Sequence, residues 1–274
     1  MTLAGGCNGF FYYPMTGYLQ TPERLHAAYE EVRIQSGDGT RLAGWYLPAK
    51  GAVRGSVLFF HGNGENMSTH YGAVYWLPDE GYNLLIFDYR GYGQSEGHPS
   101  RPGIREDGIA ALNYLRNRPD TGKTPIVLYG QSLGSAVAVS TALNSDRDGI
   151  GAVILESAFT SYRKIAREKL GSFWLTWPLQ WPLSFLVSDR DSPIDGIARL
   201  SPLPVLIVHG DADIIVPVHH AVDLYRAAKE PKKLWIVPGG RHIDAFTPRH
   251  PDFHRDLLAY LAETLRIAPD FAAP

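Results

Sequence analysis

Residues 125–143 read PIVLYGQSLGSAVAVSTAL and contain the pattern G-x-S-x-G, centred on Ser132. The apolar run before this serine is typical of a buried strand, and the alanine-rich run after it is typical of a helix. Gly130 and Gly134 lie two residues to either side, which leaves the backbone room for a sharp, strained turn between the two elements. The stretch therefore predicts a strand–turn–helix junction that presents Ser132 as a nucleophile.

A second match to the same pattern lies in NLLIFDYRGYGQSEG, at residues 83–97, and is centred on Ser95. Here the apolar run ends several residues before the serine. Gly97, Pro99 and Pro102 prevent a helix directly after it. Because the pattern is specific only with its strand and helix, we interpret Ser95 as part of a structural loop.

The rest of the chain alternates between strand and helix patterns. EVRIQS and LAGWYLP flank Gly37-Asp38-Gly39 and predict an antiparallel hairpin. Six further runs, nearly continuous in apolar residues, predict strands covered on both faces: SVLFFH, NLLIFDY, PIVLYG, GAVILES, PVLIVHG and KLWIVPG. Helices are expected at 66–79, 104–116, 133–143, 218–229 and 250–265. The pattern predicts one α/β domain over residues 1–274, with a mostly parallel eight-stranded sheet and an antiparallel N-terminal hairpin.

The histidine expected to act as the base is His242, in KLWIVPGGRHIDAF, because it follows the last strand at the sheet edge that carries Ser132. An imidazole has an ordinary pKa of about 6.5, which suits it to take and return a proton near neutrality. The acid that orients it should follow the seventh strand, in PVLIVHGDADIIVP. Asp213 is preferred there, Asp211 is expected to tie the turn together, and Glu156 is a distant alternative.

Two backbone amides are expected to stabilise a developing oxyanion. The first is the N–H of Leu133, at the N-terminus of the helix that follows the nucleophile. The second is expected from the loop HGNGEN, where Asn63 is the candidate. Loss of one such donor typically costs about 2.7–4 kcal/mol of transition-state stabilisation.

Residues 160–201 are too long for a plain crossover and predict a small helical cap. Trp174, Trp177, Trp181 and Phe185 recur within it at three- to four-residue spacing. One prediction is that these rings pack the cap onto the body of the protein; the alternative is that some of them line an acyl pocket or touch lipid. Because the insertion is short, we expect an open cleft that favours short or medium acyl chains.

Composition excludes several classes of function. The 274 residues have a formal net charge of -2, which gives no field to attract nucleic acid or an anionic bilayer. No uninterrupted apolar run reaches the roughly 18 residues of a membrane span. We expect no cofactor and no metal site, with His61 and His209 supporting loops and His219 and His220 on the surface.

The start of the chain allows two interpretations. LAGGC, residues 3–7, is similar to the small-residue box that precedes a lipidated cysteine in bacterial lipoproteins. The basic and apolar segments of a signal peptide do not precede it. The protein is therefore expected either to be cytoplasmic or to be an exported lipoprotein anchored through Cys7. Membrane association is expected only through that anchor or through the aromatic cap.

Several ordered motifs resemble the α/β-hydrolase superfamily, and more closely its Bem46-like serine hydrolases: HGNGEN, DYRGYGQSEG, LYGQSLGSA, LESAFTS, HGDADIIVP and GGRHID, spread over roughly residues 32–265. The resemblance implies the α/β-hydrolase fold, with Asp213 as the acid, His242 as the base, and Asn63 and Leu133 at the oxyanion positions. It also implies that the loop holding Ser95 is not the nucleophile. Relatives of this kind include esterases, protein thioesterases and peptidase-like proteins.

These observations predict a metal-free serine hydrolase of the carboxylesterase type, acting on a small-molecule ester through an acyl-enzyme. Thioester or amide hydrolysis, or acyl transfer on the same site, is the alternative. A catalytically silent binding protein is a more distant one.

Overall fold

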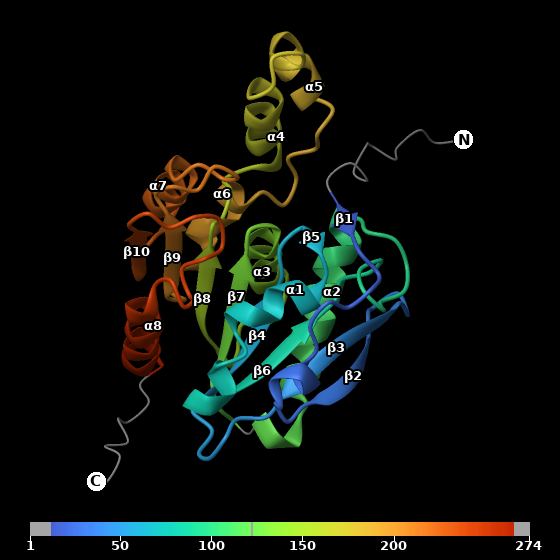
Figure 1. Ribbon diagram of the computed structural model, residues 1–274, viewed down its shortest axis with the longest axis vertical. Helices are drawn as coiled ribbons and strands as arrows, with labels where there is room; N and C mark the ends of the chain where they lie inside the picture. Colours follow the sequence, from blue (N-terminus) through green and yellow to red (C-terminus); the bar gives the residue numbers. More distant parts are fainter. Residues whose placement is uncertain (1–11, 122, 266–274) are drawn as a thin grey trace.

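The computed structural model describes residues 12–121 and 123–265. Among these residues, eight strands form one sheet in the order β10-β9-β8-β7-β4-β6-β3-β2 (Figure 1). The strands are β2 (Glu30–Gln35), β3 (Arg41–Leu47), β4 (Gly55–Phe60), β6 (Tyr82–Phe87), β7 (Ile126–Gln131), β8 (Ile150–Glu156), β9 (Val205–Gly210) and β10 (Lys232–Val237). A separate pair consists of β1 (Tyr13–Pro14) and β5 (Gly64–Glu65). Cys7 lies outside the described residues.

The sheet is parallel except at its N-terminal edge. β2 pairs antiparallel with β3, with Glu30 opposite Tyr46 and Gln35 opposite Arg41, and β3 pairs antiparallel with β6. All other neighbours are parallel. The predicted fold class, a mostly parallel sheet with an antiparallel start, is confirmed.

Helices cover both faces of the sheet (Figure 1). They are α1 (Met67–His70), α2 (Arg101–Arg116), α3 (Leu133–Asn144), α4 (Tyr162–Gly171), α5 (Gln180–Ser184), α6 (Pro193–Gly196), α7 (His219–Ala227) and α8 (Pro251–Thr264). Short 3-10 helices are η2 (Pro22–Leu25), η3 (Tyr71–Ala73), η4 (Leu77–Glu80), η5 (Pro119–Thr121), η6 (Trp177–Leu179) and η7 (Ile197–Leu200). Within the described part of the chain, no helix is both long enough and apolar enough to cross a membrane.

One predicted helix is divided into short pieces. The sequence predicted a single helix at 66–79, but α1, η3 and η4 share this segment. Asn66 caps α1 by accepting from Ser68 N, whereas Pro78 opens η4 as a new 3-10 turn. Pro78 prevents one continuous helix, because its nitrogen has no hydrogen to donate to the preceding turn.

Two apolar cores lie on opposite faces of the sheet. One packs α2, α3 and α7 against it, through side chains such as Leu112, Val137 and Leu224. The other packs α1 and α8, through side chains such as Met67 and Leu261. Because the central strands are buried on both faces, their sequences are mostly apolar, with Ser56, Asn83 and Gln131 as buried polar exceptions.

The segment 160–201 leaves the body and returns to it. In Figure 1, α4 and α5 project beyond the end of the sheet. The segment returns through α6, which contacts α3, and Gly196 of α6 lies against Leu143 of α3. Arg101 holds the returning chain by donating to the carbonyl oxygens of Ser188 (2.6 Å) and Arg190 (3.0 Å).

Candidate active site

The candidate site lies where the strand order of the sheet reverses. From β4 the chain passes to β6 on one side, then crosses back to β7 on the other side of β4. Loops that leave the carboxyl ends of such strands diverge, and open α/β sheets bind ligands in the crevice between them. Asn63 follows β4 and Ser132 follows β7, and both line one cavity of about 1070 Å³.

Ser132 occupies the predicted junction between β7 and α3. Its backbone is strained, with φ 52° and ψ -113°, a region that a non-glycine residue rarely adopts. A Cβ at Gly130 would lie 2.3 Å from Gly134 O, and one at Gly134 would lie 2.0 Å from Phe60 O. Both glycines are therefore needed for the strand, the turn and the helix to approach so closely. Ser132 N donates to Glu156 O at 2.9 Å, which ties the turn to β8.

Ser95 is held inside a loop. Its hydroxyl donates to Asp88 O at 2.7 Å and accepts from Ala43 N at 2.9 Å. No helix follows it before α2 begins at Arg101, and among the described residues it does not line the large cavity. These contacts support the structural role expected from the sequence.

His242 and Asp213 are brought together from separate loops. Nδ1 of His242 lies 2.7 Å from Asp213 Oδ2. A carboxylate can only accept, so Nδ1 carries the proton and the lone pair of the neutral ring is on Nε2. His242 lines the same cavity as Ser132, and its side chain is 19% exposed. In its neutral form, this imidazole can act there as a base through Nε2.

Asp213 is held in its charged form. Burial would raise the pKa of its carboxyl, but hydrogen bonds from His209 and His242 outweigh burial and hold that pKa below its usual range. Oδ1 also accepts from the backbone N–H groups of Ile215 (2.8 Å) and Val216 (2.9 Å). A buried carboxylate held in this way stabilises a positive imidazolium beside it.

Neither alternative carboxylate contacts the imidazole of His242. Asp211 accepts from Gly239 N at 2.7 Å and thereby joins the loops after β9 and β10. Glu156 accepts from Tyr129 Oη, from Gln131 Nε2 (2.7 Å) and from Ala245 N (3.1 Å). Glu156 therefore supports the loop that carries His242 without orienting its ring.

The loop after β4 is fixed from below by two tyrosines. Tyr89 Oη donates to His61 O at 2.9 Å. Tyr92 Oη lies 3.0 Å from both the backbone and the side-chain oxygen of Asn63. Leu133 begins α3, and it lines the cavity together with Asn63. The two predicted oxyanion positions thus border the same space as Ser132.

The cap supplies an apolar wall to the cavity. Cap side chains of the cavity wall are Tyr162, Ile165, Ala166, Lys169, Leu170, Leu183, Leu186 and Val187. On α4 they recur at three- and four-residue intervals, the spacing of one helical face. The cavity is therefore suited to an apolar group beside Ser132.

The four aromatic residues predicted for this pocket lie elsewhere. Trp174, Trp177, Trp181 and Phe185 do not line the cavity in the described chain, and all four are exposed. They do not pack the cap onto the body either. Pro178 lies in the first turn of η6 and Pro182 lies within the short helix α5, so the segment forms two short helices instead of one. Leu183 of this segment lines the cavity, while the four rings are exposed.

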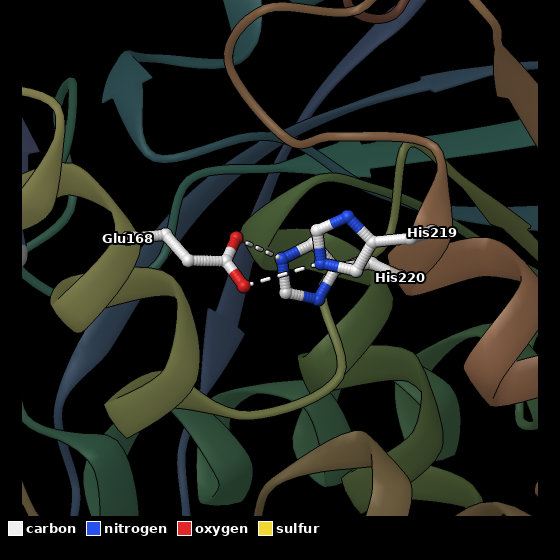
Figure 2. A group of neighbouring side chains, drawn as sticks. All are labelled: Glu168, His219 and His220. Carbon is white, nitrogen blue, oxygen red and sulfur yellow. Dashed lines mark hydrogen bonds and ion pairs between the residues drawn. The ribbon is translucent and has the colours of Figure 1, made fainter.

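Glu168, His219 and His220 form a polar cluster between the cap and the body (Figure 2). Glu168 lies on α4, and the two histidines begin α7. The two carboxylate oxygens of Glu168 lie 3.1 Å from His219 Nε2 and 2.9 Å from His220 Nε2. These ligand atoms all lie within 4.8 Å of one another, close enough to surround a metal ion.

The proton on His220 argues against a metal in this cluster. Thr160 N donates to His220 Nδ1 at 3.1 Å, so Nε2 of the neutral ring carries the hydrogen and donates to Glu168. Burial lowers the pKa of His220 to about 4, although Glu168 opposes this effect. We interpret the cluster as a hydrogen-bonded link between cap and body. The surface position expected for His220 is wrong, because its side chain is fully buried.

His70 is a site residue that the sequence did not indicate. It ends α1, lines the cavity and lies with Nδ1 3.2 Å from Gln131 Oε1. Burial lowers the pKa of its imidazole. No motif contains His70, and only the approach of α1 to the end of β7 brings it to the site.

Comparison with known proteins adds a family to this geometry. The family described as "Serine aminopeptidase, S33" matches residues 51–192, which include Ser132. An uncharacterized protein, YfhR of Escherichia coli K12, is 41% identical over 253 residues, covering 90% of this chain and 84% of its own. Protein bem46 of Schizosaccharomyces pombe is 34% identical, covering 78% of this chain and 70% of its own.

Solved structures share the fold at lower identity. The Pyrococcus furiosus esterase Pf2001 superimposes with a TM-score of 0.74 at 22% identity, over 92% of this chain and 99% of that one. An esterase of Exiguobacterium antarcticum gives a TM-score of 0.63 at 19% identity, over 85% and 99% of the two chains.

Proposed function

Because the chain belongs to the Bem46-like group of α/β-hydrolases, we propose that it is a serine hydrolase that cleaves carboxylic esters through an acyl-enzyme. One observation carries the proposal. Ser132, at a strained turn, lines the same cavity as His242, whose Nδ1 is hydrogen-bonded to the buried Asp213 at 2.7 Å. These are the residue types and the order along the chain that an α/β-hydrolase triad requires.

In the proposed reaction, Ser132 Oγ attacks the ester carbonyl carbon while Nε2 of His242 takes the hydroxyl proton. The carbonyl oxygen becomes an oxyanion and accepts from the N–H groups of Asn63 and Leu133. Collapse of this adduct breaks the bond to the alcohol, which leaves with the proton from His242. A water molecule then repeats the sequence on the acyl-enzyme and releases the acid.

The cavity supports a preference for acyl chains of medium length. Its volume of about 1070 Å³ lies just above the usual range for small-molecule sites, so it has room for more than an acetyl group. Leu170 and Leu183 offer an apolar wall to the chain. We expect kcat/KM to rise from acetyl to medium-chain nitrophenyl esters; a maximum at the longest chains would contradict this preference.

Other acyl chemistry on the same residues is the second candidate. The matching family is described as serine aminopeptidases, and the same nucleophile, base and oxyanion donors serve thioesters and amides. Turnover of an ester, a thioester and an amide that share one acyl group would rank the three. Faster turnover of the thioester or of the amide would replace the ester in the proposal.

The proposal is tested by labelling with a fluorophosphonate, which reacts with activated serines. The parent protein should be labelled, Ser132→Ala should not, and Ser95→Ala should be labelled like the parent. Labelling of Ser132→Ala would contradict the assignment of the nucleophile. A parent that is neither labelled nor active on esters would favour a catalytically silent binding protein.

A further inference from the structure

We propose that the outer face of the cap docks onto the surface of an anionic phospholipid bilayer. This outer cap face is defined by Phe173, Trp174, Leu175, Trp177, Trp181 and Phe185, all exposed. Trp174 is 77% exposed and Trp177 is 60% exposed, although side chains of this size are usually buried. Single exposed apolar residues are ordinary, but these six large ones within residues 173–185 mark a surface that meets an apolar partner.

The type of aromatic residue favours a bilayer interface. Tryptophan combines a large apolar body with an N–H that still needs a hydrogen-bond partner, so it is enriched where apolar and polar layers meet. Here three of the six side chains of the outer cap face are tryptophans. The cap also projects beyond the sheet, so an approaching flat surface can reach α5 before it meets the body (Figure 1).

Charge on the cap complements anionic lipid. The cap, residues 160–201, contains six basic and four acidic side chains within a chain of formal charge -2. Four of the basic residues lie on α4: Arg163, Lys164, Arg167 and Lys169, of which Lys164 is paired with Asp223 of the body at 2.8 Å. Glu168 is bound to His219 and His220 of the body. Basic residues beside apolar ones strengthen binding to anionic headgroups.

Two of the arginines lie on the aromatic rings themselves. The guanidinium of Arg167 lies 4.2 Å from the ring centre of Trp181, and that of Arg163 lies 5.5 Å from the ring centre of Phe185. The positive charge is thus placed at the level of the apolar side chains, where lipid phosphates would be. It also disfavours a second copy of this chain as the occupant, because a two-fold interface would bring the same cations together.

The outer cap face adjoins the mouth of the cavity. Leu186 of the cap and Ile215 of the neighbouring loop are both exposed, and both also line the cavity. Lys169 Nζ donates to Ile214 O at 3.1 Å and so holds this loop against the cap. A bilayer at the outer cap face would therefore lie beside the entrance to Ser132. The docking itself does not depend on any reaction of Ser132.

The test is flotation of the purified full chain with vesicles of phosphatidylcholine alone, or of equal parts phosphatidylcholine and phosphatidylglycerol. The parent should float with the anionic vesicles, and salt should weaken this binding. The double variant Trp174→Ser and Trp177→Ser should lose at least about tenfold in partitioning. Arg167→Glu should also bind more weakly. Tyr75→Ser, which changes an exposed aromatic residue of the body, should float like the parent.

Two readouts separate docking from folding and from catalysis. The double variant should keep the parent's thermal unfolding midpoint, and Ser132→Ala should still float, since neither docking nor the fold needs the hydroxyl. Equal flotation of the parent and the folded double variant would overturn the proposal. So would a parent that ignores both vesicles, or one that forms a dimer which the double variant abolishes. A parent protein without esterase activity would contradict the proposed function, but it would not affect the docking result.

Discussion

The edge of the sheet and the outer cap face hold their side chains in different ways. At the edge, Asp213 accepts two backbone amides, and His242 is fixed by Asp213. On the cap, Trp181 and Phe185 contact arginines of the neighbouring helix and are otherwise open to solvent. Substitutions at the edge must therefore preserve backbone geometry, whereas the cap can vary without disturbing the sheet. We expect the edge to determine the reaction and the cap to determine what reaches it.

The largest effect is expected from Asp213→Asn. The amide keeps the size of the side chain but removes the charge that stabilises an imidazolium at His242. The kcat for a soluble nitrophenyl ester should fall by about 10³–10⁴-fold.

Asp211→Asn is the matched control, because Asp211 follows the same strand and accepts only from Gly239 N in the described contacts. Its kcat should stay within a few fold of the parent. If Asp211→Asn were the more damaging of the two, the assignment of the acid would be wrong.

Gly134→Ala should be the next largest perturbation. A Cβ there would lie 2.0 Å from Phe60 O, so the junction between β7 and α3 would have to separate from β4. We expect a loss of roughly 3 kcal/mol or more in the free energy of unfolding, measured by urea denaturation. Gly72→Ala is the control, because the nearest atom to its Cβ would be Gln20 Oε1 at 3.9 Å. Equal stability of the two variants would show that the junction tolerates a side chain.

The sequence predicted the position of the candidate site at the edge of the sheet, because the backbone constraints that form this edge have local sequence signals. Strands show as apolar runs, and the turn at Ser132 shows as glycines at fixed spacing. Ser132, Asp213 and His242 occur in this order along the chain because each lies in the turn or loop that follows a successive strand, β7, β9 and β10. Each of these signals is local, and parallel strands bring their carboxyl ends to one edge without further information.

The sequence could not predict the direction of the cap side chains, because it depends on how short helices lie against the body. The spacing of Trp174, Trp177 and Trp181 indicated one shared face and could not say which way it turned. The burial of His220 was missed for the same reason, since its partners Thr160 and Glu168 are far away in the sequence. Contacts of this kind exist only after the tertiary fold has formed.

A pH test examines the link between the two regions. Burial holds the pKa of His220 at about 4, below the roughly 6.5 of an unfolded chain. As pH falls from about 6.5 towards about 4, the unfolded state takes up a proton that the folded state refuses, so stability is lost across this window. The glutamine of His220→Gln cannot take up this proton. On acidification this variant should therefore lose less of its free energy of unfolding than the parent, by roughly 1–2 kcal/mol.

Urea denaturation at about pH 7 and at about pH 4.5 measures this difference. If His220→Gln lost as much stability as the parent between the two pH values, the link would not be a source of acid sensitivity.

The smallest effect divides the cap itself into an inner and an outer face. Leu183 and Trp181 lie on the same short helix, α5, but only Leu183 lines the cavity. Leu183→Trp adds bulk to the apolar wall, so kcat/KM for a medium-chain ester should fall about tenfold relative to that for the acetyl ester. Trp181→Ala removes a ring that faces solvent, and the ratio should change less than about twofold. Since both variants alter one turn of helix, a general disturbance of α5 would shift both ratios alike, whereas a difference between them requires that specificity reside on the inner face.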